Sequence, residues 1–322
     1  MTTATTATAG VPLVAGLGRF LPTPADLARY CTSAKDGARA LGTQTSLVAG
    51  LASAGLAHRA DPARGPLFDY DDLLNAGLFS GSGRTVPELG RRYAVRFAAG
   101  SESSWYEPLS WQLTIRPPRR VPGGPRVSLS PLDTEAPGIR LIERDAAAGS
   151  AVVQVTGQRH TVSDPRVRPL WDEIVDALDS RAVRYQLVSE QLRRDHRRAW
   201  ESGVADCVVA SKELSRRLRS AGVAARVRRG YLLGLFGTEH AWCEVIEEGV
   251  AKPLDPVFAH LATAGAAGIP ANPDFARACF GGRFNRLVPC AGQNGEPLVL
   301  LDGLAAPHSA DVAVSAKPWS SR

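Results

Sequence analysis

The sequence contains few lysines and no long apolar run. Of its 38 basic residues four are lysines and the rest arginines, and the net charge is +6. No uninterrupted apolar stretch approaches the ~20 residues that span a membrane. The N-terminus has no basic segment ahead of its apolar part, which Pro12 breaks, so no signal peptide is predicted. We therefore expect a cytoplasmic protein with no membrane partner.

Motifs of several functional classes are also missing. The five cysteines are odd in number and widely separated, which does not predict a disulfide framework. No C-x-x-C or zinc-finger spacing occurs, and nothing resembles a phosphate loop or a nucleophile elbow. The basic residues are not interleaved with aromatics as in nucleic-acid modules. We expect no metal, no cofactor and no nucleic acid partner.

The length of 322 residues and the hydrophobic share of 44% predict a globular chain with a sizeable core. Residues 21–100 are predicted to be mainly helical, with one helix beginning at Thr23-Pro24, and period-two alternation predicts short strands between Ser110 and Val155. Beyond Asp164-Pro165, helical spacing predicts one helix near Leu170 and a second over residues 183–200. The expected organisation is a disordered N-terminus (1–20), an N-terminal α+β domain (21–160), a second domain (161–305) and a disordered tail (306–322).

The most informative stretch begins at Asp206-Cys207. Asp206 can cap a helix whose buried stripe is formed by Ala210, Leu214 and Leu218. The predicted helix places the Cys207 thiol in the first turn, where unpaired N–H groups and the positive end of the dipole favour a thiolate. The sequence therefore predicts a nucleophilic cysteine at a helix start.

Two antiparallel strands are predicted further along, one from His240 and one over residues 250–255, joined by a turn at Glu248-Gly249. Neighbouring side chains on such strands lie about 4.5–5.5 Å apart, so Asp255 can hold one nitrogen of His240 while the other faces a thiol. Cys243 is three residues after His240 and is predicted to point to the opposite face, into the core.

These motifs, D-C, L-R-S-A-G-V-A-A-R, H-A-W-C-E-V and L-D-P, resemble the transglutaminase-like superfamily in its bacterial stand-alone form, over roughly residues 165–258. The resemblance implies an α+β, papain-like core in which the nucleophile helix packs on an antiparallel sheet. It also implies Cys207 as nucleophile, His240 as general base and acid, and Asp255 as the residue that orients His240. The oxyanion would be held by the backbone N–H of Cys207 and one upstream side chain, for which the candidates are Trp200, Gln191 and Gln186.

The chemistry shared by Cys-His-Asp sites is acyl transfer through a thioester. We favour an amide-forming acyltransferase of a biosynthetic pathway, such as that of a natural product, with a thioester donor that is small or bound to an acidic carrier protein, and an amine acceptor. The arginine runs at 193–198, 216–219 and 226–229 are read as solvated faces or as a docking surface for such a partner. Two alternatives stay open: a cysteine protease or amidase, and a non-catalytic binding protein. Candidate pocket walls are Trp105, Tyr106, Trp111 and Trp242.

Overall fold

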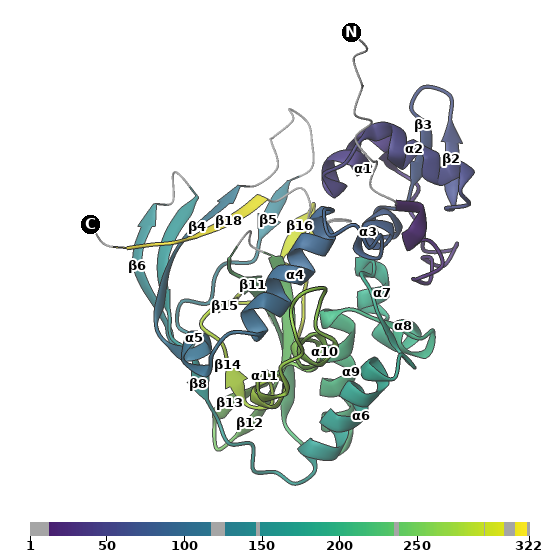
Figure 1. Ribbon diagram of the computed structural model, residues 1–322. Coiled ribbons are helices and arrows are strands. Elements are labelled where there is room, and N and C mark those ends of the chain that lie inside the picture. The colour runs from purple at the N-terminus through teal and green to yellow at the C-terminus, as the bar shows by residue number, and fades with distance from the viewer. Residues whose placement is uncertain are drawn as a thin grey trace. The chain divides into compact units, whose positions relative to one another are not determined.

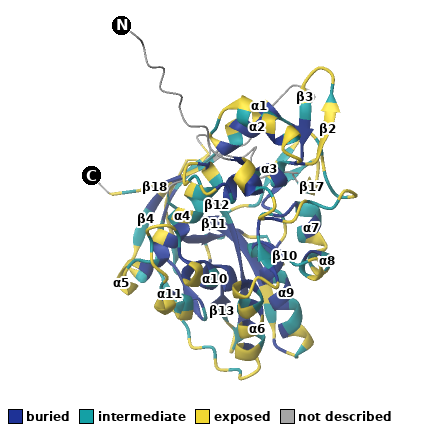
Figure 2. Ribbon diagram, turned by 45° about the vertical axis from the view of Figure 1, so that its right-hand side comes forward, coloured by how far each residue is buried: buried dark blue, intermediate teal, exposed yellow. Residues whose placement is uncertain are grey.

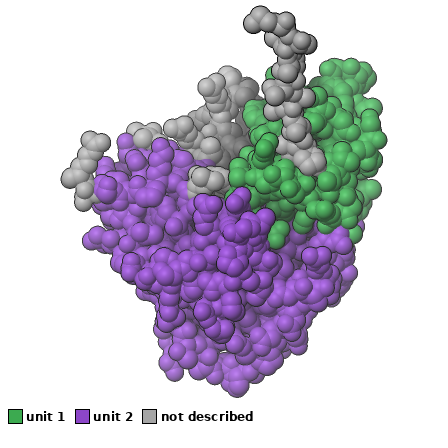
Figure 3. Space-filling view, viewed as in Figure 1, with its two compact units in different colours: residues 1–91 green, residues 92–322 purple. Residues whose placement is uncertain are grey.

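The computed structural model describes residues 13–116, 126–145, 149–234, 238–292, 294–305 and 313–320. The chain divides into two compact units, Met1–Arg91 and Arg92–Arg322 (Figure 3). Both units combine helices with mainly antiparallel strands, so the expected α+β class is confirmed. None of the described helices is long and apolar enough to cross a membrane.

The first unit is a small helical layer with a three-stranded antiparallel sheet in the order β1-β3-β2 (Figure 1). Its core includes Leu41, Leu51 and Leu73, all fully buried. Its elements are η1 (Leu13–Gly16), β1 (Thr32–Ser33), α1 (Ala34–Leu41), α2 (Thr45–Ser53), β2 (His58–Asp61), β3 (Gly65–Phe68), α3 (Tyr70–Leu78) and the start of α4 (Val86–Ala98).

Two predictions for this unit are wrong. Residues 13–20 were expected to be disordered, but they include η1, and Leu13 and Phe20 are buried in the core; residues 1–12 lie outside the described part. The helix predicted at Thr23 is replaced by a turn. The N–H and hydroxyl of Thr23 each donate to Oδ1 of Asp72 at 2.9 Å, so Thr23 holds the first turn of α3 and does not start a helix of its own.

The second unit contains the stretch that the sequence singled out. Its elements are α5 (Glu102–Tyr106), β4 (Leu109–Arg116), β5 (Val127–Leu129), β6 (Ile139–Asp145), β7 (Ser150–Val155), β8 (Gln158–Arg159), α6 (Val167–Asp179), β9 (Arg184–Tyr185), α7 (Glu190–Arg194), α8 (His196–Glu201), β10 (Val204–Ala205), α9 (Cys207–Ser220), β11 (Ala225–Leu232), β12 (Thr238–Glu247), β13 (Val250–Leu254), α10 (Pro256–Ala264), α11 (Pro273–Ala278), β14 (Gly282–Arg283), β15 (Leu287–Pro289), β16 (Val299–Leu301), β17 (Leu304–Ala305) and β18 (Ala313–Pro318).

Two four-stranded antiparallel sheets organise this unit. One has the order β18-β4-β7-β6, and the other has the order β13-β12-β11-β15. Helix α9 packs along β11 and β12, with α6 and α10 beside it (Figure 1). Buried residues gather on β11, β12 and α10 (Figure 2). The unit therefore presents a helix packed on an antiparallel sheet, with Cys207 at the start of that helix.

The predicted domain boundary near residue 160 is wrong. Trp111 and Val153, from the first of these sheets, share one buried cluster with Tyr231 and Val288 from the second. Apolar surface buried between two sheets joins them in one folding unit, because separating them would expose it to water. The strands between residues 109 and 155 thus belong to the same unit as Cys207, and the division falls at residue 91.

The predicted disordered tail is also wrong over Ala313–Pro318. These residues form β18, which pairs antiparallel with β4, for example through Ser315 and Thr114. Ala316 is buried in the shared core, and the N–H of Trp319 donates to Ser110 O at 2.8 Å. Residues 306–312, in the same predicted tail, lie outside the described part of the chain.

The single helix predicted over residues 183–200 is divided into three elements. Strand β9 pairs in parallel with β10, after which α7 and α8 follow as short helices. Ser189 caps α7 by accepting from the N–H of Leu192, and Asp195 caps α8 by accepting from that of Arg198. These two internal caps end the helical run, and the β9–β10 pair brings the segment that follows β9 next to the residues that precede Cys207.

Candidate active site

Cys207 is the first residue of α9, as predicted from its cap. Oδ1 of Asp206 accepts the N–H groups of Val208 and Val209 at 3.0 and 2.9 Å. Cys207 itself is half-buried. A sulfur in this position lies at the positive end of the helix dipole, which stabilises negative charge on it.

His240 and Asp255 form a buried pair. In the register of β12 with β13, Cys243 is opposite Leu254, so Asp255 follows the last strand residue and lies near His240. Oδ2 of Asp255 is 2.6 Å from Nε2 of His240, and Oδ1 accepts the N–H of Phe258 at 2.9 Å as the cap of α10. The carboxylate is therefore fixed from two sides, and the predicted contact between these two residues is present.

The charge state of His240 follows from this pairing. Burial lowers the pKa of His240, but the charge and hydrogen bond of Asp255 outweigh burial, and a hydrogen bond with the Cys207 side chain adds to them, so that the pKa rises to about 10. Because Asp255 occupies Nε2, the ring nitrogen that is left for Cys207 is Nδ1. The ring of Phe258 stacks on the imidazole with centroids 4.4 Å apart and restricts its rotation.

The other cysteines differ from Cys207 in their surroundings. Cys243, Cys279 and Cys290 are buried, and burial raises the pKa of each thiol, to about 12 for Cys290. Cys243 lies in the core, as predicted from strand parity. Cys31 is exposed. Among the five cysteines, Cys207 is the one whose side chain contributes to the raised pKa of a histidine paired with a carboxylate.

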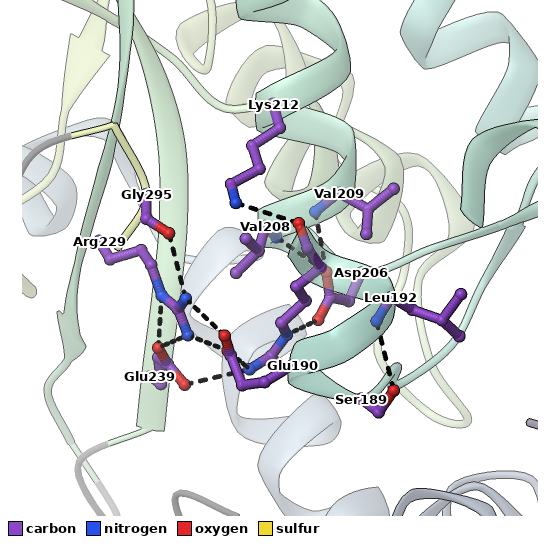
Figure 4. Close-up of polar contacts among 11 residues, drawn as sticks. Ser189, Glu190, Leu192, Asp206, Val208, Val209, Lys212, Arg229, Glu239 and Gly295 are labelled. Carbon is purple, nitrogen blue, oxygen red and sulfur yellow. Dashed lines mark hydrogen bonds and ion pairs between the residues drawn. The ribbon is translucent and has the colours of Figure 1, made fainter. Parts of the chain in front are cut away.

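A set of charged residues, two buried and three partly buried, lies beside Cys207, and we call it the buried charge cluster: Glu190, Arg193, Asp206, Arg229 and Glu239. Nε of Arg193 is 2.6 Å from Oδ2 of Asp206, and its Nη1 is 2.7 Å from Glu190 and 3.4 Å from Glu239. Arg229 donates to Glu239, Glu190 and Gly295 O (Figure 4). The side chain of Arg229 is 3% exposed.

The buried charge cluster corrects the reading of the arginine runs as solvated faces. Arg193 and Arg229 belong to two of those runs, yet each is covered and paired, whereas Arg197 is 67% exposed. The signal that could have identified Arg229 is its place on the same face of β11 as the buried Val227, although Arg228 on the other face is buried too. No local signal identifies Arg193.

Asp206 offers a first test of the local geometry. We expect Asp206→Ala to lower the free energy of unfolding by about 3 kcal/mol, because it removes the cap of α9 and leaves Arg193 short of a buried partner. Asp206→Asn keeps an oxygen that can cap the helix, so its loss should be smaller. Urea denaturation of both variants measures the difference, and equal losses would mean that the cap contributes little.

The three candidates for the oxyanion side chain lie in different places. Trp200 packs under the guanidinium of Arg217, 5.6 Å from its ring. Arg217 is ten residues after Cys207 on α9, which is about 15 Å along the helix axis. Gln191 lies on α7 and is half-buried. Gln186 is buried, and its N–H donates to Ala205 O at 3.0 Å, two residues before Cys207.

The aromatic residues proposed as pocket walls are mostly core. Trp111 is 2% exposed and donates to Asn285 O, and Trp242 is 1% exposed and stacks near His240 with centroids 6.3 Å apart. Trp105 and Tyr106 border a cavity of about 710 Å³ whose lining comes from residues 100–106, 159–161 and 272–282. Cys207, His240 and Asp255 are not among the residues that line that cavity.

Within the described ranges, no three His, Cys, Asp or Glu residues come together as ligands for an ion. At Cys207 the described side chains bring together a thiol, an imidazole that can carry a proton, and a carboxylate that stabilises the protonated imidazole. These three groups are suited to attack on a carbonyl carbon.

Comparisons with known proteins give little beyond the geometry. No known protein family matches the sequence, and no curated protein matches it either. A solved structure from Cytophaga hutchinsonii, described as a "Putative Cysteine Protease", is similar over 68% of this chain and 88% of its own, with 14% identity and a TM-score of 0.29. A TM-score this low supports no inference about function.

Proposed function

We propose that this chain is a cysteine-dependent acyltransferase with a transglutaminase-like, papain-like core, which forms an amide through a thioester on Cys207. The observation that carries the proposal is the buried 2.6 Å contact between His240 and Asp255, placed beside a half-buried cysteine in the first turn of a helix. A raised pKa of about 10 makes His240 an imidazolium at neutral pH, and in the proposed reactive state this imidazolium is paired with the Cys207 thiolate.

The first half-reaction follows from this charge state. The Cys207 sulfur attacks the carbonyl carbon of the donor and forms a C–S bond. We assign the resulting oxyanion to the N–H of Cys207, since the Asp206 cap uses those of the next two residues, and to the side chain of Gln186. His240 then gives its proton to the leaving group as the bond to that group breaks. The product is the thioester.

The second half-reaction restores the site. An amine attacks the thioester carbon, its proton passes to His240, and the C–S bond breaks to return the thiolate. Charge supports a carrier-bound donor, because Arg194, Arg197 and Arg219 are exposed and the chain carries a net charge of +6. These arginines suit an acidic carrier protein that presents a thioester.

The product distinguishes the proposal from its alternatives. A Cys31→Ser chain is offered an activated acyl thioester with and without a panel of small amines, and products are identified by mass spectrometry. We expect an amide whose yield rises with amine and disappears in Cys207→Ala. Free acid formed at one rate with or without amine would identify a hydrolase, and turnover that is unchanged in Cys207→Ala would contradict any role of the triad.

The oxyanion assignment gives a further prediction. We expect Gln186→Ala to lower kcat by about 100-fold to 1000-fold, because one donor to the developing negative charge is lost. Gln191→Ala is the matched control and should change kcat by less than about threefold, since α7 has no such role in the assignment. A large loss of kcat in Gln191→Ala, with little loss in Gln186→Ala, would assign the oxyanion to Gln191 instead.

A further inference from the structure

The residues that precede the proposed nucleophile and base are held by one side chain. Asp206 comes directly before Cys207, and Glu239 comes directly before His240. Nε of Arg193 is 2.6 Å from Oδ2 of Asp206, and Nη1 of the same guanidinium is 3.4 Å from Oε2 of Glu239. A planar guanidinium with several fixed donors can bridge two carboxylates in this way, whereas an ammonium acts as a single point charge.

Arg193 is itself fixed in place. Its carbonyl accepts Nζ of Lys212 at 3.0 Å, which ties the end of α7 to α9, and its Nη1 bonds Glu190 at 2.7 Å. Glu190 is also bonded by Arg229, whose other contacts include Glu239 (Figure 4). The side chain of Arg193 is 15% exposed. The bridge is therefore anchored at its backbone and at its tip, and does not depend on a mobile surface pair.

Arg193 also places a positive charge near the Cys207 sulfur. Burial lowers the pKa of Arg193, but the carboxylates of Asp206, Glu190 and Glu239 outweigh burial, and Cys207 acts in the same direction, so the pKa lies well above its usual range. The guanidinium thus stays protonated at every pH at which the protein is folded, and its positive charge lies near Cys207.

We propose that Arg193 is a positioning residue: by bridging Asp206 and Glu239 it fixes the spacing between Cys207 on α9 and His240 on β12. The inference rests on the proposed function, in which these two residues exchange a proton. Arg193, which is outside the triad, holds the start of the helix that carries the nucleophile against the strand that carries the base. Small errors in such spacing strongly reduce rates.

The test uses the reactivity of Cys207, which needs no knowledge of the substrate. In the full chain carrying Cys31→Ser, the rate of Cys207 alkylation by iodoacetamide is measured at pH 6 and pH 9. We expect Arg193→Lys to lower the rate at pH 6 by about tenfold relative to the parent chain, because a sulfur held less closely to the His240 imidazolium should react more slowly. The change at pH 9 should be less than about threefold, since free thiols are themselves largely ionised there.

Arg229→Lys is the matched control, since Arg229 is at least as buried and bonds Glu239 and Glu190 but does not contact Asp206. It should keep the ratio of the two rates, although its stability falls. Arg193→Gln is a second variant in case Arg193→Lys does not fold. An unchanged ratio in a folded Arg193 variant, or an equal change in Arg229→Lys, would overturn the proposal. Failure of acyl transfer with this alkylation pattern intact would overturn the proposed function instead.

Discussion

Asp255→Asn is expected to lower the rate of acyl-enzyme formation by about 10²-fold to 10⁴-fold, the range that general acid–base catalysis contributes. Asparagine can still contact Nε2 of His240, but it does not stabilise a positive imidazole. Without the carboxylate, burial is the dominant influence on the pKa of His240 and lowers it. The proton that the mechanism needs on His240 is then lost at neutral pH.

The rate of acyl-enzyme formation should also depend on pH differently in Asp255→Asn. In the native chain the pKa of His240 is about 10, so the alkaline limb of the rate should fall near that pH, and in Asp255→Asn it should move to lower pH. Rates measured between pH 6 and pH 11 test this. If the rates of the two proteins fell at the same alkaline pH, a group other than His240 would be responsible for the fall.

The free energy of unfolding should also depend on the His240–Asp255 pair. The pKa of His240 is higher in the folded chain than its ordinary value of 6.5, so the stabilisation is fully present below pH 6.5 and is lost as pH rises to about 10. Asp255→Asn should not show that decline, and urea denaturation across this window compares the two.

Arg229→Met is expected to cause the largest loss of stability, about 3–5 kcal/mol at neutral pH. The guanidinium of Arg229 is 3% exposed and bonds the carboxylates of Glu190 and Glu239. In Arg229→Met, these two carboxylates would share Arg193 as their remaining cation. Buried carboxylates that lose a counter-charge are far less stable than in water. Urea denaturation of the full chain gives the free energy of unfolding.

Arg277→Met is the control for this prediction. Arg277 pairs with Asp274 on α11, but the side chain is 67% exposed, and such surface pairs contribute about 0–1 kcal/mol. A loss in Arg229→Met as small as that of Arg277→Met would show that the buried charge cluster contributes little to folding.

Local signals explain which parts of the fold were predicted correctly. The Asp206 cap, the apolar stripe of α9 and the left-handed Gly222 that follows it are set by neighbouring residues, and the structure has each of them. The turn at Gly249 likewise returns β13 alongside β12. Because Cys207, His240 and Asp255 each lie at the end of such a local element, their approach could be inferred from the sequence.

Long-range pairing explains what was missed. Strand β18 joins β4 across some two hundred positions of sequence, and Trp111 finds its buried partners on β11 and β15. Nothing in the residues next to Trp111 specifies those partners, so the domain boundary was misplaced. The sequence likewise predicts a solvated Arg193, because its carboxylate partners, apart from Glu190, come from distant segments.

The most direct test of the central claim is the mass of the chain after incubation with an activated acyl thioester in the absence of amine. In the Cys31→Ser background we predict one acyl group, mapped by peptide analysis to Cys207, absent in Cys207→Ala and formed far more slowly in His240→Ala. A chain that gains no acyl group on Cys207, or gains it equally fast without His240, would contradict the account.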